Sequence, residues 1–511
     1  MNTKENHFFK KRITFGCAIN KVIRTIAIAI LLGLNLLNFV FTTHVEYNIS
    51  EVVTITRAFP LLPCFIALLL FLMFYFIYCF ADKLPQEKYL LLLFCLLYMI
   101  AGIYLITHVD STLRDDAKSV HDVAMQFSQG NYEQLRTGGY IFRKVHQLGL
   151  VSFERIIGLF SFSEKFLFII NLGLVNAINY LTYKLSDLKF SHNKTINLFT
   201  IVLSYLFLPQ FFFVLFAYGL VVGFFFLLLA IYHMEKYFMT NKKSHIVIVV
   251  FSITVAVLLK SNYLIGALAL FGCFIMKLVT QKRWHYLALA LAVVVLPVLS
   301  THVLNIYYEI ESGIEIQSEE PKIMYVAMGI NPMNKWQRGP GWYDASNWVW
   351  YEQAGYDAEL ATDKAMECIR NCFTIYREDP IASLKFFRDK LASLWCEPMY
   401  QSVWSGPLES GGQKTHTPIL RELYNGGPVE NRICIFMKAY LILIYGVTIG
   451  YFVSGKHREY QVDYAPIYFI GGFLFHIVWE AKSQYVYTYI FILIPLCACS
   501  MVNLLNKMKR R

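Results

Sequence analysis

Three aspartates lie close together in the first long polar segment of the chain, residues 108–160: Asp110, Asp115 and Asp116. If residues 115–129 form a helix, Asp116 falls on the same face as apolar side chains at helical spacing. A carboxylate held against an apolar surface has its charged form disfavoured, which raises its pKa and its basicity. This pattern favours Asp116 as a residue that accepts a proton from a hydroxyl group.

The other acidic residues leave alternatives open. Asp115 is the second candidate for the proton acceptor, but both Asp115 and Asp116 also suit the first turn of a helix, where acidic side chains complement the helix dipole. Asp110 ends an apolar run and is equally consistent with a solvated border residue. Further along, His146 and Gln147 follow a predicted Gly-Gly turn and are candidates for substrate binding, with a structural histidine as the alternative.

Two lysines stand at the ends of apolar runs. Lys260 lies in LLKSNYL, and Lys482 lies in HIVWEAKSQYVY next to Glu480. A charge at such a depth is costly unless it is paired or needed, so each lysine is a candidate for binding the phosphate of a lipid-linked substrate. The alternatives are snorkelling to lipid headgroups and, for Lys482, an ion pair with Glu480 or Asp116.

The composition predicts the elements that must position these residues. The chain is 57% hydrophobic and only 16% charged, with a mean hydropathy of +0.46, whereas soluble domains carry about 25% charged residues. The net charge of +11 is spread in short clusters between apolar runs, which argues against a nucleic-acid-binding stripe. We therefore expect an α-helical multi-pass membrane protein.

Apolar runs of roughly 20 residues, long enough to cross a bilayer, predict about twelve transmembrane helices. They begin near Val22, Ala58, Tyr89, Lys165, Ile196, Leu220, Ile246, Tyr263, Tyr286, Arg432, Tyr464 and Tyr487. Residues 196–238 are interrupted by Pro209 and Gly219, so they form either two spans or one span plus a re-entrant segment. The first run lacks a cleavage site and is expected to be a retained helix.

The distribution of Lys and Arg in short loops predicts that both termini are cytoplasmic. Two long segments then lie outside. The predicted organisation is N-terminal transmembrane helices (1–107), a catalytic outer loop with interfacial helices (108–160), central transmembrane helices (161–303), an outer, mainly α-helical soluble domain (304–431) and C-terminal transmembrane helices (432–511).

The outer segment is expected to contain helices at residues 357–377 and 380–394, preceded by an ordered loop at 331–356. Its tryptophans suit sugar rings, a membrane-interface belt or a small core equally well. They are Trp336, Trp342, Trp348, Trp350, Trp395 and Trp404. Most of the eleven cysteines, Cys434 among them, lie in or beside apolar spans and are interpreted as small core residues.

Four stretches, taken together with the alternating spans, carry a resemblance to a known group. They are RDDAKSVHDVAMQFSQGNY, GGYIFRKVHQLGL, LLKSNYL and WEAKSQYVYTYIFILIP. Their order and spacing resemble the GT-C superfamily of polytopic glycosyltransferases, and most closely the bacterial members of glycosyltransferase family 39, akin to protein O-mannosyltransferases and to the aminoarabinose transferase of lipid A. Two features depart from that pattern: the acidic loop follows the third span instead of the first, and Lys144-Val145 replaces an expected Tyr-Pro.

The resemblance implies transfer of a sugar from a polyprenyl-phosphate donor to an envelope acceptor, which is a glycan, a lipid or a protein. It implies an acidic catalytic residue in the first large outer loop, which is Asp116 with Asp115 as competitor. It also implies substrate contacts from His146 and Gln147. Further contacts are implied from Glu480, Lys482 and Tyr485 in the last of the four stretches, WEAKSQYVYTYIFILIP, which we call the closing motif.

The expected chemistry is an inverting transfer in which Asp116 activates the acceptor hydroxyl. The departing polyprenyl phosphate is a stable anion, so no general acid is needed, and Lys482 with Lys260 would stabilise it. No cofactor is implied, although a cluster of aspartates could recruit a divalent metal. The absence of a nucleotide-binding Gly-rich loop favours a lipid-linked donor over a nucleotide sugar.

Two other functions are consistent with many apolar spans and a large outer segment. A polysaccharide polymerase or ligase also uses polyprenyl-linked sugars, but would depend on Arg and His residues in the outer segment. A transporter or lipid flippase would typically show two related halves with charged residues at mid-membrane, and the sequence has no such halves.

Overall fold

The computed structural model describes residues 3–46, 51–110, 113–316, 319–333, 338–454 and 463–510, and the side chains from residue 16 onward. Within these residues, nine helical segments are long and apolar enough to cross a membrane. They are formed by α1 (Thr3–Val40), α2 (Leu61–Phe80), α3 (Glu87–Thr107), α7 (Glu164–Lys189), α10 (Leu220–Thr240), α12 (Leu264–Gln281), α13 (His285–Ser312), α19 (Pro428–Ser454), and α21 (Tyr487–Phe491) with α22 (Ile494–Lys509).

The remaining predicted spans differ from simple membrane-crossing helices. α11 (Lys243–Leu259) and α20 (Tyr464–Val478) are shorter apolar helices. α8 (Lys194–Leu206) is followed by α9 (Leu208–Phe212) and a 3-10 turn, η3 (Phe213–Leu215), at a bend of 53°. A helical multi-pass architecture is therefore confirmed, while the count of twelve stays a prediction. The interruption expected within residues 196–238 is present, and a separate helix, α10, follows it.

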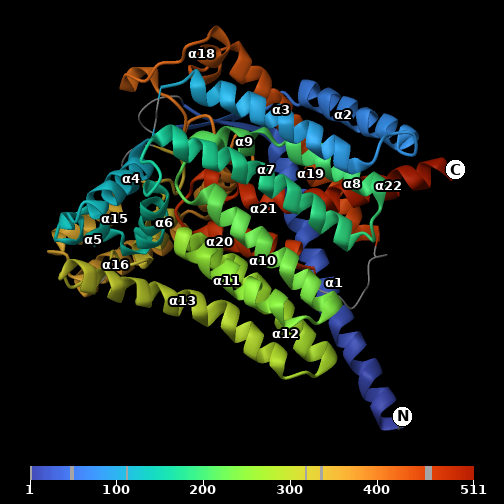
Figure 1. The fold of residues 1–511 in the computed structure, drawn as a ribbon, viewed down its shortest axis with the longest axis horizontal. Helices are drawn as coiled ribbons and strands as arrows, with labels where there is room; N and C mark the ends of the chain where they lie inside the picture. The colour runs from blue at the N-terminus through green and yellow to red at the C-terminus, as the bar shows by residue number, and fades with distance from the viewer. Residues whose placement is uncertain are drawn as a thin grey trace.

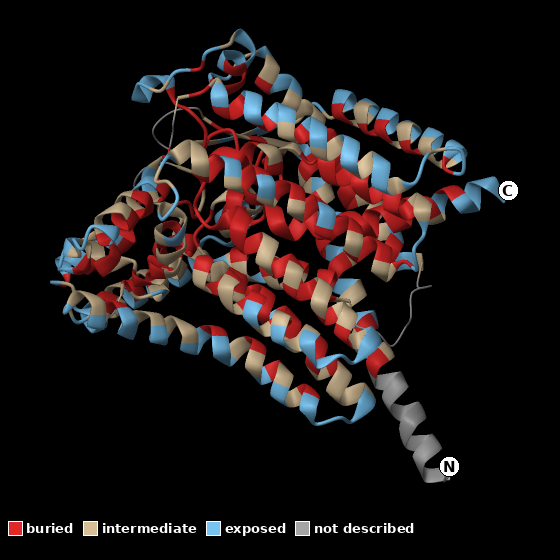
Figure 2. Ribbon diagram, in the orientation of Figure 1, coloured by how far each residue is buried: buried red, intermediate tan, exposed pale blue. Residues whose placement is uncertain are grey.

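The apolar surface of the molecule is arranged for a lipid environment. Figures 1 and 2 show α2 and α3 along one side and α13 along the opposite side, with buried residues concentrated in α10, α21 and the neighbouring helices between them. Phe76, Ile100 and Val303 are large apolar side chains exposed on these outer helices. Such a surface is unfavourable in water and favourable in hydrocarbon.

Short helices gather at one end of the bundle. They come from the first polar segment as α4 (Asp115–Ser128), η1 (Glu133–Leu135), α5 (Tyr140–Arg143), η2 (Val145–Gln147) and α6 (Leu148–Gly158), and from the later polar segment as α14 (Ile323–Ile330), α15 (Ser346–Gln353), α16 (Ala358–Glu378), α17 (Pro380–Trp395), η5 (Glu409–Gly411) and α18 (Pro418–Tyr424). The helices expected at 115–129, 357–377 and 380–394 are confirmed to within one residue at each end.

Two details correct the predicted organisation of the later segment. Residues 331–356 are not only loop, because α15 lies within them. The expected boundary at residue 304 falls inside α13, which continues to Ser312. α14, α15 and α16 share a small hydrophobic core with Phe142 of the first polar segment, whereas Trp395 at the end of α17 is part of the main core. Both polar segments therefore pack into one continuous structure.

A two-stranded hairpin, absent from the sequence-based expectations, follows α1. β1 (Phe41–Val45) pairs antiparallel with β2 (Val53–Arg57), with His44 opposite Thr54. The strands are rich in β-branched residues, which suit a pleated surface. Thr43 is buried and donates a hydrogen bond to the carbonyl of Ala392 in α17, at 3.1 Å. Glu51, two residues before β2, is buried.

Candidate active site

A cavity of about 680 Å³ lies where the short helices meet the bundle. All eight residues selected from the sequence line it, from three separate parts of the chain: Asp115, Asp116, His146, Gln147, Lys260, Glu480, Lys482 and Tyr485. Helix α4, which lines this cavity, is held to α6 by a buried pair in which His121 Nδ1 lies 2.8 Å from Glu154 Oε2. The tertiary structure thus brings these candidates to one site.

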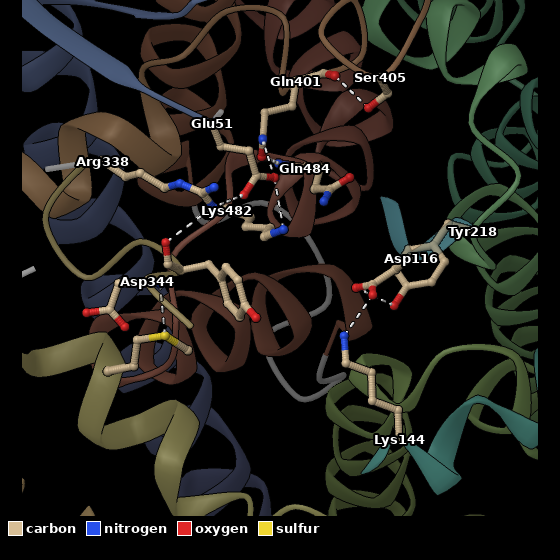
Figure 3. Close-up of polar contacts among 12 residues, drawn as sticks. Glu51, Asp116, Lys144, Tyr218, Arg338, Asp344, Gln401, Ser405, Lys482 and Gln484 are labelled. Carbon is tan, nitrogen blue, oxygen red and sulfur yellow. Dashed lines mark hydrogen bonds and ion pairs between the residues drawn. The ribbon is translucent and has the colours of Figure 1, made fainter. Parts of the chain in front are cut away.

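Asp116 is the most firmly held carboxylate of the cavity. The ammonium of Lys144 donates to Asp116 Oδ1 at 2.8 Å, and the hydroxyl of Tyr218 donates to Oδ2 at 3.2 Å (Figure 3). Tyr218 lies in the non-helical segment between α9 and α10. The next residue, Gly219, adopts a left-handed conformation with φ of +74°. The interruption of the apolar run therefore places a tyrosine in the site.

The hydrogen bonds continue from Tyr218 to His146. The Gln147 amide donates to the Tyr218 hydroxyl at 2.8 Å and lies 3.2 Å from His146 Nε2. On the other side of the ring, His146 Nδ1 lies 2.7 Å from a carboxylate oxygen of Glu319. In this geometry Nε2 faces the amide nitrogen of Gln147, which is a donor, and Nδ1 faces the Glu319 carboxylate, which is an acceptor. His146 and Gln147 thus hold Asp116 indirectly, through Tyr218.

The expected rise in the pKa of Asp116 is wrong. Burial by itself raises the pKa, but the positive charges of Lys144, Lys482 and Lys260 outweigh it and hold the pKa of Asp116 well below its usual range. The amphipathic pattern of α4 is correct, since Val120, Val123 and Phe127 are buried. The pattern could not include cations that reach Asp116 from other elements.

Asp115 has different surroundings. It opens α4 with a left-handed φ of +48°, which is uncommon for a residue other than glycine, and its side chain is exposed to the cavity. Among the described residues, no hydrogen bond or ion pair engages its carboxylate. Burial of the surrounding site raises the pKa of Asp115, and the neighbouring Arg114 only partly opposes this. Asp115 is therefore the more basic and the more available of the two aspartates.

Lys482 forms a second cluster with an unexpected partner. Its ammonium lies 2.9 Å from Glu51 Oε1, while Arg338 contacts Glu51 Oε2 at 3.3 Å and the amide of Gln401 donates to Oε1 at 3.2 Å (Figure 3). The ion pairs expected with Glu480 or Asp116 are absent among the described residues. Glu51 comes from the first hairpin, which the sequence did not indicate as part of the site.

Of the described lysines that line the cavity, Lys260 is the one whose positive charge is not balanced by a directly paired carboxylate. Its ammonium lies 3.6 Å from the centre of the Tyr218 ring and 5.8 Å from that of Tyr485, and among the described residues it forms no ion pair. Next to it, Leu264, Ile265 and Leu268 of α12 and Phe475 of α20 give the cavity an apolar wall. Leu268 is 51% exposed, so this wall continues onto the outer surface of the bundle.

Close backbone contacts fix the position of Lys260. A Cβ atom on Gly149 of α6 would lie 2.0 Å from the carbonyl oxygen of Leu258, and one on Gly219 would lie 2.4 Å from that of Leu259. Two glycines therefore allow α6 and the start of α10 to pack directly against the end of α11. Lys260 follows this end immediately, and its own backbone is extended.

A buried lysine outside the cavity positions the closing motif. The ammonium of Lys390 in α17 donates to three backbone carbonyls, those of Gly329 at 2.5 Å, Ile477 at 2.9 Å and Trp479 at 2.7 Å. This arrangement uses all three protons of the ammonium group. It joins α14 and the end of α20 just before Glu480, whose pKa burial raises to about 7.

Of the remaining candidates from the sequence, some line the cavity and others lie elsewhere. Trp348 and Trp404 line the cavity, whereas Trp342 and Trp395 are fully buried core residues. Trp350 is partly buried in the small outer core, and Trp336 lies outside the described residues. Asp110 is away from the cavity, where it binds His416 at 2.9 Å and accepts a hydrogen bond from the amide of Lys414. Asp115 and Asp116 belong to no group of three metal-ligating side chains within the described part of the chain.

Several important residues were not selected from the sequence. They are Glu51, Arg114, Lys144, Tyr218, Glu319 and Arg338. For two of them the sequence contained an indication of importance. Lys144 occupies the position that departs from the family pattern, and Tyr218 is next to Gly219, which interrupts an apolar run. The others lie in loops whose sequences are unremarkable, and only tertiary packing brings them together.

Comparisons of the chain with protein-family models, with curated proteins and with solved structures give no match. The fold and site define a helical multi-pass membrane protein with one large, charged cavity at the end of its bundle. The resemblance to GT-C glycosyltransferases rests on the four sequence stretches alone.

Proposed function

We propose that this protein is a membrane glycosyltransferase that moves a sugar from a polyprenyl-phosphate donor to an acceptor in the cell envelope. The reaction would take place at the outer face of a bacterial plasma membrane, with both termini cytoplasmic. One observation carries the proposal. Asp115, whose carboxylate has no hydrogen-bond or ion-pair partner among the described residues, faces the same cavity as Lys260, which forms no ion pair within that part of the chain, and one wall of the cavity is apolar and continues to the lipid-facing surface.

The donor fits the Lys260 side of the cavity. A phosphate there would gain a charge-assisted contact from an ammonium that forms no direct ion pair within the described part of the chain. The isoprenoid tail would leave along Leu264, Leu268 and Phe475, between α12 and α20. Lys482 is less suited to this role than expected from the sequence, because Glu51 and its partners already engage it. Lys482 instead helps to keep Glu51 and Arg338 in the opposite wall.

Asp115 is the better general base of the two aspartates. In the proposed step it accepts the proton of the acceptor hydroxyl while that oxygen forms a bond to the anomeric carbon. The bond from the anomeric carbon to the phosphate oxygen breaks, and polyprenyl phosphate leaves as an anion opposite Lys260, with inversion. Asp116, which the family resemblance favoured, is ionised and held by Lys144 and Tyr218, so it orients these groups.

Purified protein assayed with a polyprenyl-phosphate sugar tests the proposal. Asp115→Asn should lower kcat by about 10²–10⁴-fold, the usual contribution of a general base. Asp122→Asn is the matched control, because Asp122 lies on the same helix but pairs with Lys118 outside the cavity. Asp115→Asn at the normal rate, or absence of transfer by the wild type with every donor sugar, would refute the assignment.

Replacing Lys260 with Gln should raise the KM for the donor by about tenfold or more, since hydrogen bonds to charged groups contribute about 1.5–3 kcal/mol. Lys118→Gln is the control for loss of a lysine at the same end of the bundle. An unchanged donor KM in Lys260→Gln would show that Lys260 does not bind the phosphate of the donor.

A polysaccharide polymerase or ligase is the second candidate, because Arg338 of the later polar segment and His146 both line the cavity. The donor would again be a polyprenyl-linked glycan. The product separates the two functions: a glycosyltransferase adds one sugar unit, whereas a polymerase or ligase transfers a chain of repeating units. A flippase would translocate the donor without consuming it.

A further inference from the structure

A second group of chemically active side chains lies away from the cavity, where the first hairpin meets α19. His44 of β1, Glu430 in the first turn of α19 and Cys434 one turn later come together there. Their ligating atoms all lie within 4.8 Å of one another. The thiol of Cys434 contacts Glu430 Oε1 at 2.6 Å, and His44 Nδ1 lies 3.8 Å from the same oxygen.

We propose that His44, Glu430 and Cys434 bind a divalent transition-metal ion of the zinc class. Imidazole, carboxylate and thiolate are the three side-chain ligands that Zn²⁺ prefers, at 2.0–2.3 Å from the ion. Glu430 and Cys434 are four residues apart on one helix, so they share a face and point to the same place. Three protein ligands would leave a fourth position for water.

The burial of Glu430 provides independent support. Glu430 is only 5% exposed, and among the described residues it forms no ion pair with a lysine or an arginine. Within the described part of the chain, its carboxylate contacts a thiol and an imidazole, neither of which carries a permanent charge. A buried carboxylate without a cation is costly, and a divalent ion would supply the missing positive charge.

The hairpin geometry directs His44 to this place. Thr43 and Val45 are the buried positions of β1, and Thr43 bonds to α17, so His44 alternates to the other face. Lys438, one turn after Cys434, donates to the carbonyl of Phe41 in the same strand. β1 is therefore already fixed to α19 at one point, and the ion would fix it at a second.

Binding is an exchange of a proton for a metal ion. The S–H bond of Cys434 breaks, its proton passes to water, and the sulfur lone pair coordinates the ion together with one nitrogen of His44 and an oxygen of Glu430. No electron transfer is involved. Because the same hairpin carries Glu51 to the cavity, the ion would also stabilise the position of the Glu51 and Lys482 pair.

The proposal can be tested on the purified full-length protein, stripped with a chelator and titrated with Co²⁺ as a spectroscopic probe. One equivalent should bind with a thiolate-to-cobalt charge-transfer band and tetrahedral visible bands, and Zn²⁺ should displace it. Cys434→Ser should lose the charge-transfer band, and His44→Gln should weaken binding at least tenfold. Cys79→Ser, which removes an exposed cysteine of α2, should behave like the wild type.

The absence of a charge-transfer band in the wild type, or an equal band in Cys434→Ser and His44→Gln, would overturn the proposal. His44 is partly exposed, so His44→Gln should fold even if Cys434→Ser does not. As a second measurement, Zn²⁺ should raise the melting temperature of the wild type and not that of His44→Gln. None of these readouts involves sugar transfer, so they remain valid if the proposed glycosyltransferase function fails.

Discussion

At the scale of single residues, the two neighbouring aspartates have opposite electrostatic environments. Asp116 lies among lysines and is ionised under all ordinary conditions, which makes it a good anchor and a weak base. Asp115 faces the cavity and its pKa is raised, so its carboxylate can accept and retain a proton from an acceptor hydroxyl. In the proposed mechanism, two neighbouring aspartates therefore have different roles: Asp116 orients other groups and Asp115 accepts the proton.

This difference predicts the pH dependence of transfer. A base with a raised pKa loses activity as the pH falls through that pKa, so the acid limb of kcat/KM should lie above the ordinary aspartate value of about 3.9. Arg114 lowers and Glu51 raises the pKa of Asp115 through their charges. The acid limb should therefore move to higher pH in Arg114→Gln and to lower pH in Glu51→Gln. Two shifts in the same direction would contradict Asp115 as the base.

At the scale of secondary-structure elements, the site depends on helix ends that meet at close range. α6 and the start of α10 reach the end of α11 only because Gly149 and Gly219 lack a Cβ atom. On the other side, Lys390 ties α14 and α20 together through backbone carbonyls. Backbone contacts next to Lys260 and Lys482 therefore help to position both lysines.

Gly149→Ala tests the importance of this contact. The new methyl group would meet the carbonyl of Leu258, so α6 and α11 must separate and Lys260 must move. We expect a loss of about 1–3 kcal/mol in the free energy of unfolding, the usual cost of overpacking, together with a higher KM for the donor. Gly173→Ala in α7 is the control, because its Cβ would have no atom within 4 Å. A Gly149→Ala variant with wild-type melting temperature and KM would show that the contact is unimportant.

At the scale of the whole molecule, both polar segments gather at one end of the bundle and build the cavity together. Figure 1 shows α4, α5, α15 and α16 at this end, away from the N- and C-termini. A cavity that uses residues from the first hairpin to the closing motif can form only when the entire bundle is folded. The proposed function requires that this end faces the outside of the cell.

Site-directed labelling in intact cells tests that orientation. A cysteine introduced at Asp122, on α4, should react with a membrane-impermeant maleimide. A cysteine at Lys243, at the exposed start of α11, should react only after permeabilisation. Peptide mapping distinguishes these labels from the native cysteines. Labelling of the Lys243 position in intact cells, with protection at Asp122, would place the cavity in the cytoplasm and exclude the proposed reaction.

The sequence by itself determined the membrane class, the approximate positions of the helices and eight of the residues that line the cavity. Apolar runs, helix caps and isolated charges are local signals, and they act within one turn or one span. Asp357 and Asp379, for example, cap α16 and α17 through hydrogen bonds that their neighbours in sequence already imply. The eight selected residues meet in one cavity because each lies in a segment that connects two apolar helices at the same end of the bundle.

Only the tertiary structure decided how the charges are paired. The partner of Lys482 is Glu51 from a distant hairpin, and the partner of Asp116 is Lys144. These contacts reverse the pKa expected for Asp116 and make Asp115 the proposed base in its place. Electrostatic energies depend on distances in space, and a linear pattern contains no distances between segments that are far apart in the chain.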